Sequence, residues 1–230
     1  MTEERAEPSG LAGRLSDVRE RVASAAGDAG RDPADVTTIV VTKFQPVTMI
    51  EELLRLGVRD FGENRHQEAQ GKAAELAGRD ITWHFVGQVQ GKKARQVRSY
   101  ANVVHSVDRD SLATNLGSAD SSIDCFIQVN LTEDPARGGI DPAGLDRLVE
   151  HVLHTPGLRL LGLMAVAPLE VAPAPAFARV RSLGERIRRL APEARFLSMG
   201  MSQDYPEAIR EGATHLRIGT AITGNRPTLG

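Results

Sequence analysis

The chain has a single cysteine among its 230 residues, so it can form no disulfide bond within itself. Cys125 lies in the apolar run 123–129, which predicts an inert core thiol of the kind found in cytosolic proteins. Neither sign of charge is in excess, since the formal net charge is −2, and this argues against nucleic acid or an anionic membrane as the main partner. No apolar run approaches the ~20 residues that a membrane span needs.

Two further signals are missing from the sequence. The first five residues, Met1 to Arg5, lack the apolar core of a secretion signal, so we expect a cytoplasmic protein. The histidine, cysteine and carboxylate residues show no metal-ligand spacing, so we expect no metal.

What the sequence does contain is a repeated alternation of short apolar runs with helical segments. The runs that predict β-strands are 37–43, 58–61, 82–86, 103–107, 123–129, 158–166, 195–198 and 214–218. Repeats of this kind at this chain length predict an α/β fold, a (β/α)8 TIM barrel. An open doubly wound sheet is the alternative, because a pattern alone cannot show that a sheet closes.

One amphipathic helix precedes the first repeat. Apolar residues recur at spacings of four, three and four from Leu11 to Val22. Residues 1–8 are expected to be a disordered tip. No linker composition divides the remainder, so we expect residues 9–230 to form one domain.

Lys43 follows the first apolar run, 37–41, whose β-branched composition is typical of a strand covered on both faces. Pro46 cannot continue a strand ladder, and Thr48 with Glu51 has the spacing of a capping box that would begin the next helix. Lys43 is therefore expected at the carboxyl end of a buried strand, where low-dielectric surroundings favour the neutral amine of a Schiff-base lysine. The alternative is a lysine whose stem merely covers a strand end.

Two turns after the last two strands have the character of a phosphate site. Met201 and Ser202 follow the seventh strand, with Ser202 expected near the N-cap of a helix, and Gly219 and Thr220 follow the eighth. Loops at these places in a (β/α)8 barrel often hold phosphate, because glycine permits close approach and free N–H groups at a helix start favour an anion. Arg217 shares a strand face with Gly219, and an inward guanidinium needs a carboxylate or a ligand acceptor.

A lysine, a phosphate cradle and an arginine at one end of a barrel fit an aromatic aldehyde that carries a phosphate, which is pyridoxal 5′-phosphate (PLP). The same lysine and phosphate site would also suit a class I aldolase, in which Lys43 attacks the carbonyl of a sugar phosphate. A bound chromophore in the purified protein would distinguish the two.

The motifs, taken in order, resemble the pyridoxal-phosphate homeostasis protein family over nearly the full length. The matching stretches are 41–43, 61–64, 83–87, 105–108, 162–164, 197–202 and 217–220. The most distinctive is the Ser-Met-Gly-Met-Ser string at 198–202. The resemblance implies the PLP barrel also found in alanine racemase, without that enzyme's second, β-rich domain.

The resemblance also implies which residues contact the cofactor. They are Lys43, Asn64, His84, Ser198, Met201, Ser202, Arg217, Gly219 and Thr220. By this similarity Lys43 would carry the Schiff base and Arg217 would face the pyridine nitrogen. Ser202, Gly219 and Thr220 would hold the phosphate. The pocket would be lined by Asn64, His84, Ser198 and Met201.

For the histidines, spacing alone gives a different interpretation. Spacing alone indicates that His84 is a barrel-core histidine whose ring nitrogens have hydrogen-bond partners, and only the resemblance makes it a pocket residue. His66 and His105 are expected at a helix surface and a strand end.

The resemblance implies a carrier: a protein that holds PLP as a Schiff base and serves intracellular homeostasis by buffering and delivery, as a monomer, without strong catalysis of its own. It could contact apo forms of PLP enzymes transiently. The alternative is a racemase-like enzyme that acts on amino acids. Chemistry favours the carrier, because an arginine at the pyridine nitrogen leaves that nitrogen unprotonated and the ring a poor electron sink. The second acid–base group of alanine racemase is also a tyrosine of the domain that this chain lacks.

Overall fold

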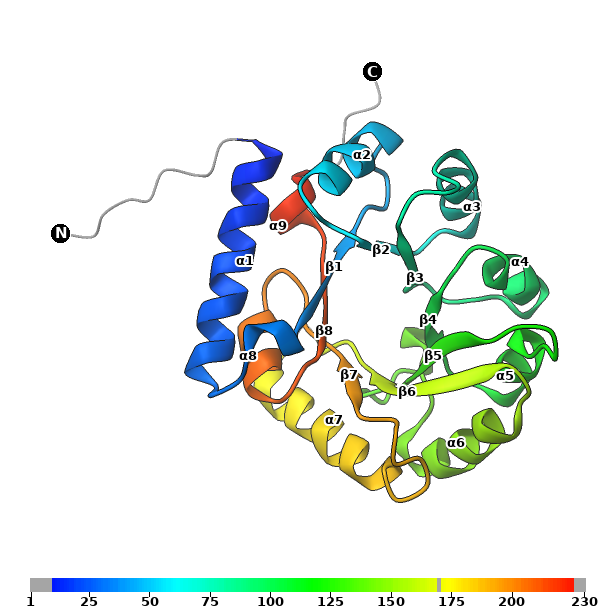
Figure 1. The fold of residues 1–230 in the computed structure, drawn as a ribbon. Helices are drawn as coiled ribbons and strands as arrows, with labels where there is room; N and C mark the ends of the chain where they lie inside the picture. Colours follow the sequence, from blue (N-terminus) through cyan, green and yellow to red (C-terminus); the bar gives the residue numbers. More distant parts are fainter. Residues whose placement is uncertain (1–9, 169–170, 226–230) are drawn as a thin grey trace.

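Parallel strands close into a barrel in the computed structural model, which describes residues 10–168 and 171–225 (Figure 1). The strands are β1 (Thr37–Val41), β2 (Asp60–Glu63), β3 (Thr82–Phe85), β4 (Val103–Val107), β5 (Ile123–Gln128), β6 (Leu158–Met164), β7 (Phe196–Ser198) and β8 (His215–Ile218). They follow one another around the barrel in chain order, and β1 pairs with β8 to close it, with Ile39 beside Arg217. The predicted (β/α)8 barrel is confirmed, and the open sheet is wrong.

Helices surround the barrel on its outside (Figure 1). They are α1 (Leu11–Asp28), α2 (Val47–Arg55), α3 (His66–Glu75), α4 (Ala94–Arg98), α5 (Asp110–Leu116), α6 (Leu145–His154), α7 (Pro173–Ile187), α8 (Tyr205–Arg210) and α9 (Thr220–Thr223). Short 3-10 turns lie at η1 (Pro33–Asp35), η2 (Gly91–Lys93), η3 (Pro135–Arg137) and η4 (Pro142–Gly144). Within residues 10–168 and 171–225, no helix is long and apolar enough to cross a membrane.

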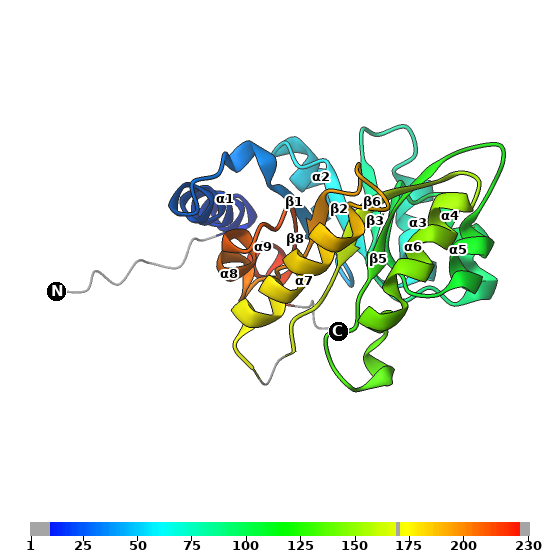
Figure 2. The ribbon, with the colours of Figure 1, turned by 90° about the horizontal axis from the view of Figure 1, so that it is seen from below.

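The extra N-terminal helix, α1, lies beside α8 and α9 where the barrel closes (Figures 1 and 2). Its apolar face from Leu11 to Val22 is buried, as the spacing predicts. Arg14 in this helix donates from Nε to the carbonyl oxygen of Ile222 in α9, at 2.8 Å. Helix α1 therefore holds in place the segment that follows β8. The tip predicted at residues 1–8 lies outside the described residues.

The interior has two chemically different regions. Between the sheet and the helices the packing is apolar, with residues such as Val40 and Leu53 almost fully buried. Inside the barrel a small apolar group that includes Phe126 adjoins buried polar side chains, among them His105 and Arg217. Polar groups inside a barrel are tolerated only when they are hydrogen-bonded. A binding site in this region would therefore depend on the hydrogen bonds of these side chains.

The predicted capping box at Thr48 and Glu51 does not form. Helix α2 begins one residue earlier, at Val47, with Pro46 as its N-cap and no side-chain capping bond. The ring of Pro46 fixes its φ, here −70°, and its carbonyl oxygen accepts the N–H of Met49. The proline therefore sets the start of the helix in place of the threonine.

Candidate functional site

Lys43 lies just beyond β1, at the carboxyl end of the barrel. The strand ends at Val41, and the chain turns at Phe44, whose φ is +65°, a value that few non-glycine residues adopt. The Lys43 side chain is exposed. The low-dielectric surroundings predicted for it are therefore wrong for this structure, because the strand ends two residues early and leaves the lysine in an open turn.

The loop after β7 is held by an acidic residue. The Met201 N–H donates to Oδ1 of Asp204 at 2.6 Å, and Asp204, not Ser202, is the N-cap of α8. Burial raises the pKa of the Asp204 carboxyl, while the Met201 N–H and the nearby Arg217 charge act in the opposite direction. Ser202 lies half-buried in the turn that leads to α8, two residues before the N-cap, so it lies near the helix start as the sequence predicts.

Met201 lines a hollow at the carboxyl ends of β5 and β6. The hollow has a volume of about 300 Å³, and its walls include Gln128, Val129 and Val166. Among the residues predicted to bind a cofactor, Met201 lines this hollow.

Gly219 and Thr220 follow β8, as the sequence predicts, and begin the short helix α9. Gly219 is the N-cap, and a Cβ atom at this position would lie 3.8 Å from Cβ of Val41. This turn therefore packs against the end of β1, two residues before Lys43. Its first N–H groups have no partner within the helix.

Arg217 is buried with its guanidinium at the carboxyl ends of β6 and β7. Nη1 donates to the carbonyl oxygen and the hydroxyl oxygen of Ser198, each at 2.7 Å, and Nη2 donates to the carbonyl oxygen of Ala165 at 2.9 Å. Burial lowers the pKa of Arg217 to about 10, partly offset by Asp204, so the group keeps its charge at neutral pH. Its partners in the described chain are neutral acceptors rather than the carboxylate that the sequence offered as one possibility.

A line of hydrogen bonds runs from Arg217 through the barrel to Asp60 at the start of β2. The Ser198 hydroxyl lies 2.8 Å from Nδ1 of His105, Nε2 of His105 lies 2.9 Å from Nδ1 of His84, and Nε2 of His84 lies 3.0 Å from Oδ1 of Asp60. We call this the barrel relay. An arginine can only donate and a carboxylate can only accept, so with neutral rings the pattern assigns the Nε2–H tautomer to both histidines.

The barrel relay bears on the two interpretations of His84. The residue is 3 % exposed and both of its ring nitrogens have protein partners, which is the satisfied barrel-core histidine that spacing alone indicates. Its assignment as a cofactor contact stays a prediction. It connects to Arg217 through His105 and Ser198.

Sequence reasoning missed His105, which was expected at a strand end but is fully buried within β4. Burial lowers its pKa well below the usual histidine value, and the neighbouring His84 and Arg217 act in the same direction. A signal was present in the sequence. Inward positions of a strand alternate, and His105 has a valine two positions away on either side, Val103 and Val107. This pattern predicts that His105 lies on the same buried face as the valines.

Asn64 follows β2 and packs on the loop after β3. Its Oδ1 atom is buried and has no hydrogen-bond partner within residues 10–168 and 171–225. A Cβ atom on Gly87 would lie 2.2 Å from the Asn64 carbonyl oxygen, so only glycine allows the two loops to approach this closely. Unsatisfied buried acceptors are uncommon, and each calls for a reason.

Most of the predicted residues lie at or just beyond the carboxyl ends of strands, whereas His84 lies within β3 and bonds to Asp60 at the start of β2. Only some of them touch. Arg217 and Ser198 bond directly, and His84 reaches them through His105. Lys43 makes no hydrogen bond to the others in the described part of the chain. In that part, no group of three or more His, Cys, Asp or Glu side chains is arranged to hold a metal ion.

Comparison with known proteins gives concordant matches along the chain. The family model of the alanine racemase N-terminal domain matches residues 18–227. The pyridoxal phosphate homeostasis protein of Pseudomonas aeruginosa is 41% identical over 225 residues, which cover 95% of this chain and 96% of that protein. The protein of the same name from Mycobacterium tuberculosis is 38% identical over 241 residues, with 95% and 93% covered.

Solved structures extend the likeness to three dimensions. PipY of Synechococcus elongatus, solved both without and with PLP bound, is 36% identical and superposes with TM-scores of 0.83 and 0.80, over 94% of this chain and 100% of PipY. Alanine racemase of Corynebacterium glutamicum is 16% identical with a TM-score of 0.66, over 94% of this chain and 62% of its own, which shows the shared fold alone. The resemblance inferred from the motifs is confirmed: the chain belongs to the alanine racemase N-terminal domain family, together with the pyridoxal phosphate homeostasis proteins.

Proposed function

We propose that the chain binds PLP at the carboxyl end of the barrel and serves the homeostasis of this cofactor. The observation that carries the proposal is the junction of β8 with β1, which brings buried Arg217 and the Gly219 turn next to the strand that leads to Lys43. Relatives that bear the name of PLP homeostasis proteins support it, as does PipY, which was solved with PLP bound.

The residues present fit a ligand with a pyridine nitrogen, ring substituents and a phosphate. The bonds of Arg217 to Ser198 and Ala165 use three of the five N–H donors of a guanidinium, which leaves donors for a ring nitrogen. The orphan Oδ1 of Asn64 offers an acceptor to a ligand hydroxyl group. The N–H groups at the start of α9 suit a phosphate.

When bound, the cofactor supplies an aldehyde, whose carbon forms a C=N bond with a lysine amine while its oxygen leaves as water. In our proposal Lys43 provides that amine, and its exposed side chain is free to reach the ligand. Ser202, Gly219 and Thr220 hold the phosphate, and Arg217 donates to the ring nitrogen.

The remaining residues of the predicted set act around these. Asn64 and Met201 line the pocket, while Ser198 and His84 act through the barrel relay. Because its guanidinium remains charged at neutral pH, Arg217 donates a hydrogen bond without giving up a proton, which keeps the ring nitrogen unprotonated.

We propose a carrier rather than a catalyst, since a ring with an unprotonated nitrogen stabilises a carbanion poorly. The carrier would work in the cytoplasm as a monomer and pass PLP to apo-enzymes in transient contacts. A racemase-like enzyme is the second candidate, favoured by the match to the alanine racemase N-terminal domain model. The chain spans only 62% of the Corynebacterium alanine racemase, so the rest of that enzyme has no counterpart in the superposition.

Three experiments test the proposal. Titration of the purified protein with PLP should give one saturable site per chain, and the loaded protein should restore activity to an apo PLP enzyme that is separated from free cofactor. Exchange of amino-acid α-protons in deuterated water should proceed no faster with the loaded protein than with free PLP. Exchange well above that rate on any common amino acid would replace the carrier with the enzyme.

A further inference from the structure

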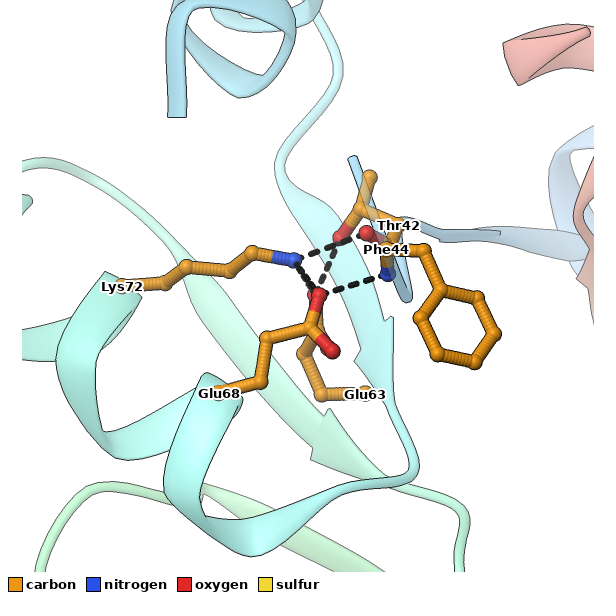
Figure 3. A network of polar contacts seen from close by, with 5 residues as sticks. All are labelled: Thr42, Phe44, Glu63, Glu68 and Lys72. Atoms are coloured by element: carbon orange, nitrogen blue, oxygen red, sulfur yellow. Dashed lines mark hydrogen bonds and ion pairs between the residues drawn. The ribbon is translucent and has the colours of Figure 1, made fainter. Parts of the chain in front are cut away.

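A buried cluster of charges lies on the outer side of the barrel wall, between β2 and α3 (Figure 3). Lys72 of α3 is 6 % exposed, and its Nζ lies 2.7 Å from Oε1 of Glu63 and 2.6 Å from Oε1 of Glu68. Its third bond runs to the carbonyl oxygen of Thr42, at 2.8 Å. An ammonium group has three donors, and each of them is used.

The bonds of this cluster end on both chain neighbours of Lys43. On the preceding side, Thr42 offers its carbonyl oxygen to Lys72 and donates its hydroxyl to Oε1 of Glu63 at 2.7 Å. On the following side, the Phe44 N–H donates to Oε1 of Glu68 at 2.5 Å. Figure 3 shows these side chains converging on the turn from α3 and β2. The main chain is therefore held immediately before and immediately after Lys43, whose own side chain is exposed.

The turn needs such support because its conformation is unfavourable in isolation. Phe44 has a φ of +65°, and a residue with a Cβ atom is strained there, so the surroundings must hold it in place. Buried charges are also retained only when they are paired. A packing role alone would not require an ammonium ion with two carboxylates at this place, since an apolar side chain would fill the same volume.

We propose that Lys72 and Glu68 are positioning residues for Lys43: they fix the backbone on both sides of the reactive lysine and so aim its flexible side chain at the ligand. This inference rests on the proposed function, since it assigns to Lys43 the amine that reacts with PLP. Neither residue belongs to the set predicted from the sequence.

The test compares Glu68→Gln with Lys72→Met, and uses Glu75→Gln, an exposed carboxylate of the same helix, as the matched control. Lys72→Met leaves two carboxylates without their buried counter-ion and can fail to fold, whereas Glu68 is already partly exposed and its amide variant keeps the shape of the side chain. Three quantities are measured. They are hydrogen exchange of the Phe44 amide in the protein without cofactor, the rate at which added PLP becomes trapped on Lys43 by borohydride, and the affinity for pyridoxine 5′-phosphate.

In Glu68→Gln, loss of a charge-assisted bond should speed exchange of the Phe44 amide about tenfold and slow attachment by a similar factor. The affinity for pyridoxine 5′-phosphate, which lacks the aldehyde, should change less than about twofold, because a positioning residue affects the reaction of Lys43 and not the binding of the phosphate. Glu75→Gln should match the wild type in all three measurements.

Unchanged exchange and unchanged attachment in Glu68→Gln, with a wild type that does attach PLP at Lys43, would overturn the positioning role. Equal losses in attachment and in pyridoxine 5′-phosphate binding would also overturn it, since they indicate general damage to the pocket. If the wild type itself attaches no PLP at Lys43, the proposed function fails instead. Hydrogen exchange of the Phe44 amide needs no cofactor, so it still shows whether Glu68 holds the turn.

Discussion

The guanidinium of Arg217 donates from a single nitrogen, Nη1, to both the carbonyl oxygen and the hydroxyl oxygen of Ser198, each at 2.7 Å. Both residues are buried inside the barrel, and the same hydroxyl continues to Nδ1 of His105. A buried charge that is held by neutral acceptors depends on every bond of such a network. One hydroxyl group therefore connects the cationic end of the proposed site to the histidines behind it.

Replacing Ser198 by alanine should lower the free energy of unfolding by roughly 1–3 kcal/mol, because the ring nitrogen of His105 becomes a buried acceptor without a donor. Urea denaturation measures this loss. Ser182→Ala is the control, since that serine is exposed on α7 and bonds only within its helix, and it should cost less than about 0.5 kcal/mol. Equal effects of the two substitutions would show that the barrel relay contributes nothing measurable.

Gly200→Ala should destabilise the protein more than Gly212→Ala does. Both glycines have a positive φ, +94° and +93°, so both alanines meet the same backbone strain of roughly 1–2 kcal/mol. Only at Gly200 would the new Cβ also lie 2.7 Å from Cβ of Ala208, which adds an overpacking cost of about 1–3 kcal/mol. The difference between the two midpoints of urea denaturation measures this term, and identical midpoints would contradict the close packing of the loop after β7.

His215 should make the protein less stable in acid. Burial, together with the nearby His84, lowers the pKa of His215 from 6.5 to about 4, so the unfolded chain binds a proton in this window that the folded chain does not. The free energy of unfolding should therefore fall as the pH drops from 6.5 towards 4, by on the order of 3 kcal/mol for this residue.

The control for the acid effect is His215→Asn, which cannot titrate and should show a flatter dependence of stability on pH over the same range. Carboxylates of the protein titrate equally in both proteins and cancel in the difference. A stability difference between wild type and variant that stays constant from pH 7 to 4 would rule out the depressed pKa.

The barrel was predictable from the sequence because its strands are short, apolar and separated by helical patterns. The β-branched run before Lys43 and the glycine after Ile218 fall where the structure has them. Boundaries were less predictable. Pro46 is the N-cap of α2 in place of the expected capping box, and β1 ends at Val41, two residues earlier than predicted.

The candidate site could be predicted only for residues at strand ends and in the turns that follow them. Lys43 and Arg217 stand at strand ends, and the motif order identifies the family. The supporting groups could not be found in the same way. Lys72 looks like any lysine of an amphipathic helix, and its burial between Glu63 and Glu68 follows from the packing of α3 on the barrel. For His105 the flanking valines indicated burial, but its partners lie on other strands, 21 and 93 residues away, so its hydrogen bonds could not be found from the local pattern.

The central claim is that Lys43 carries the cofactor. The measurement that tests it most directly is borohydride reduction of the protein with bound PLP, followed by peptide mapping, with Lys43→Ala and the exposed-lysine control Lys92→Ala beside the wild type. We predict a pyridoxyl group on Lys43 in the wild type and in Lys92→Ala, and loss of the visible absorption band in Lys43→Ala. A pyridoxyl group on another lysine, or a Lys43→Ala protein with the same band and the same affinity for PLP, would contradict the account.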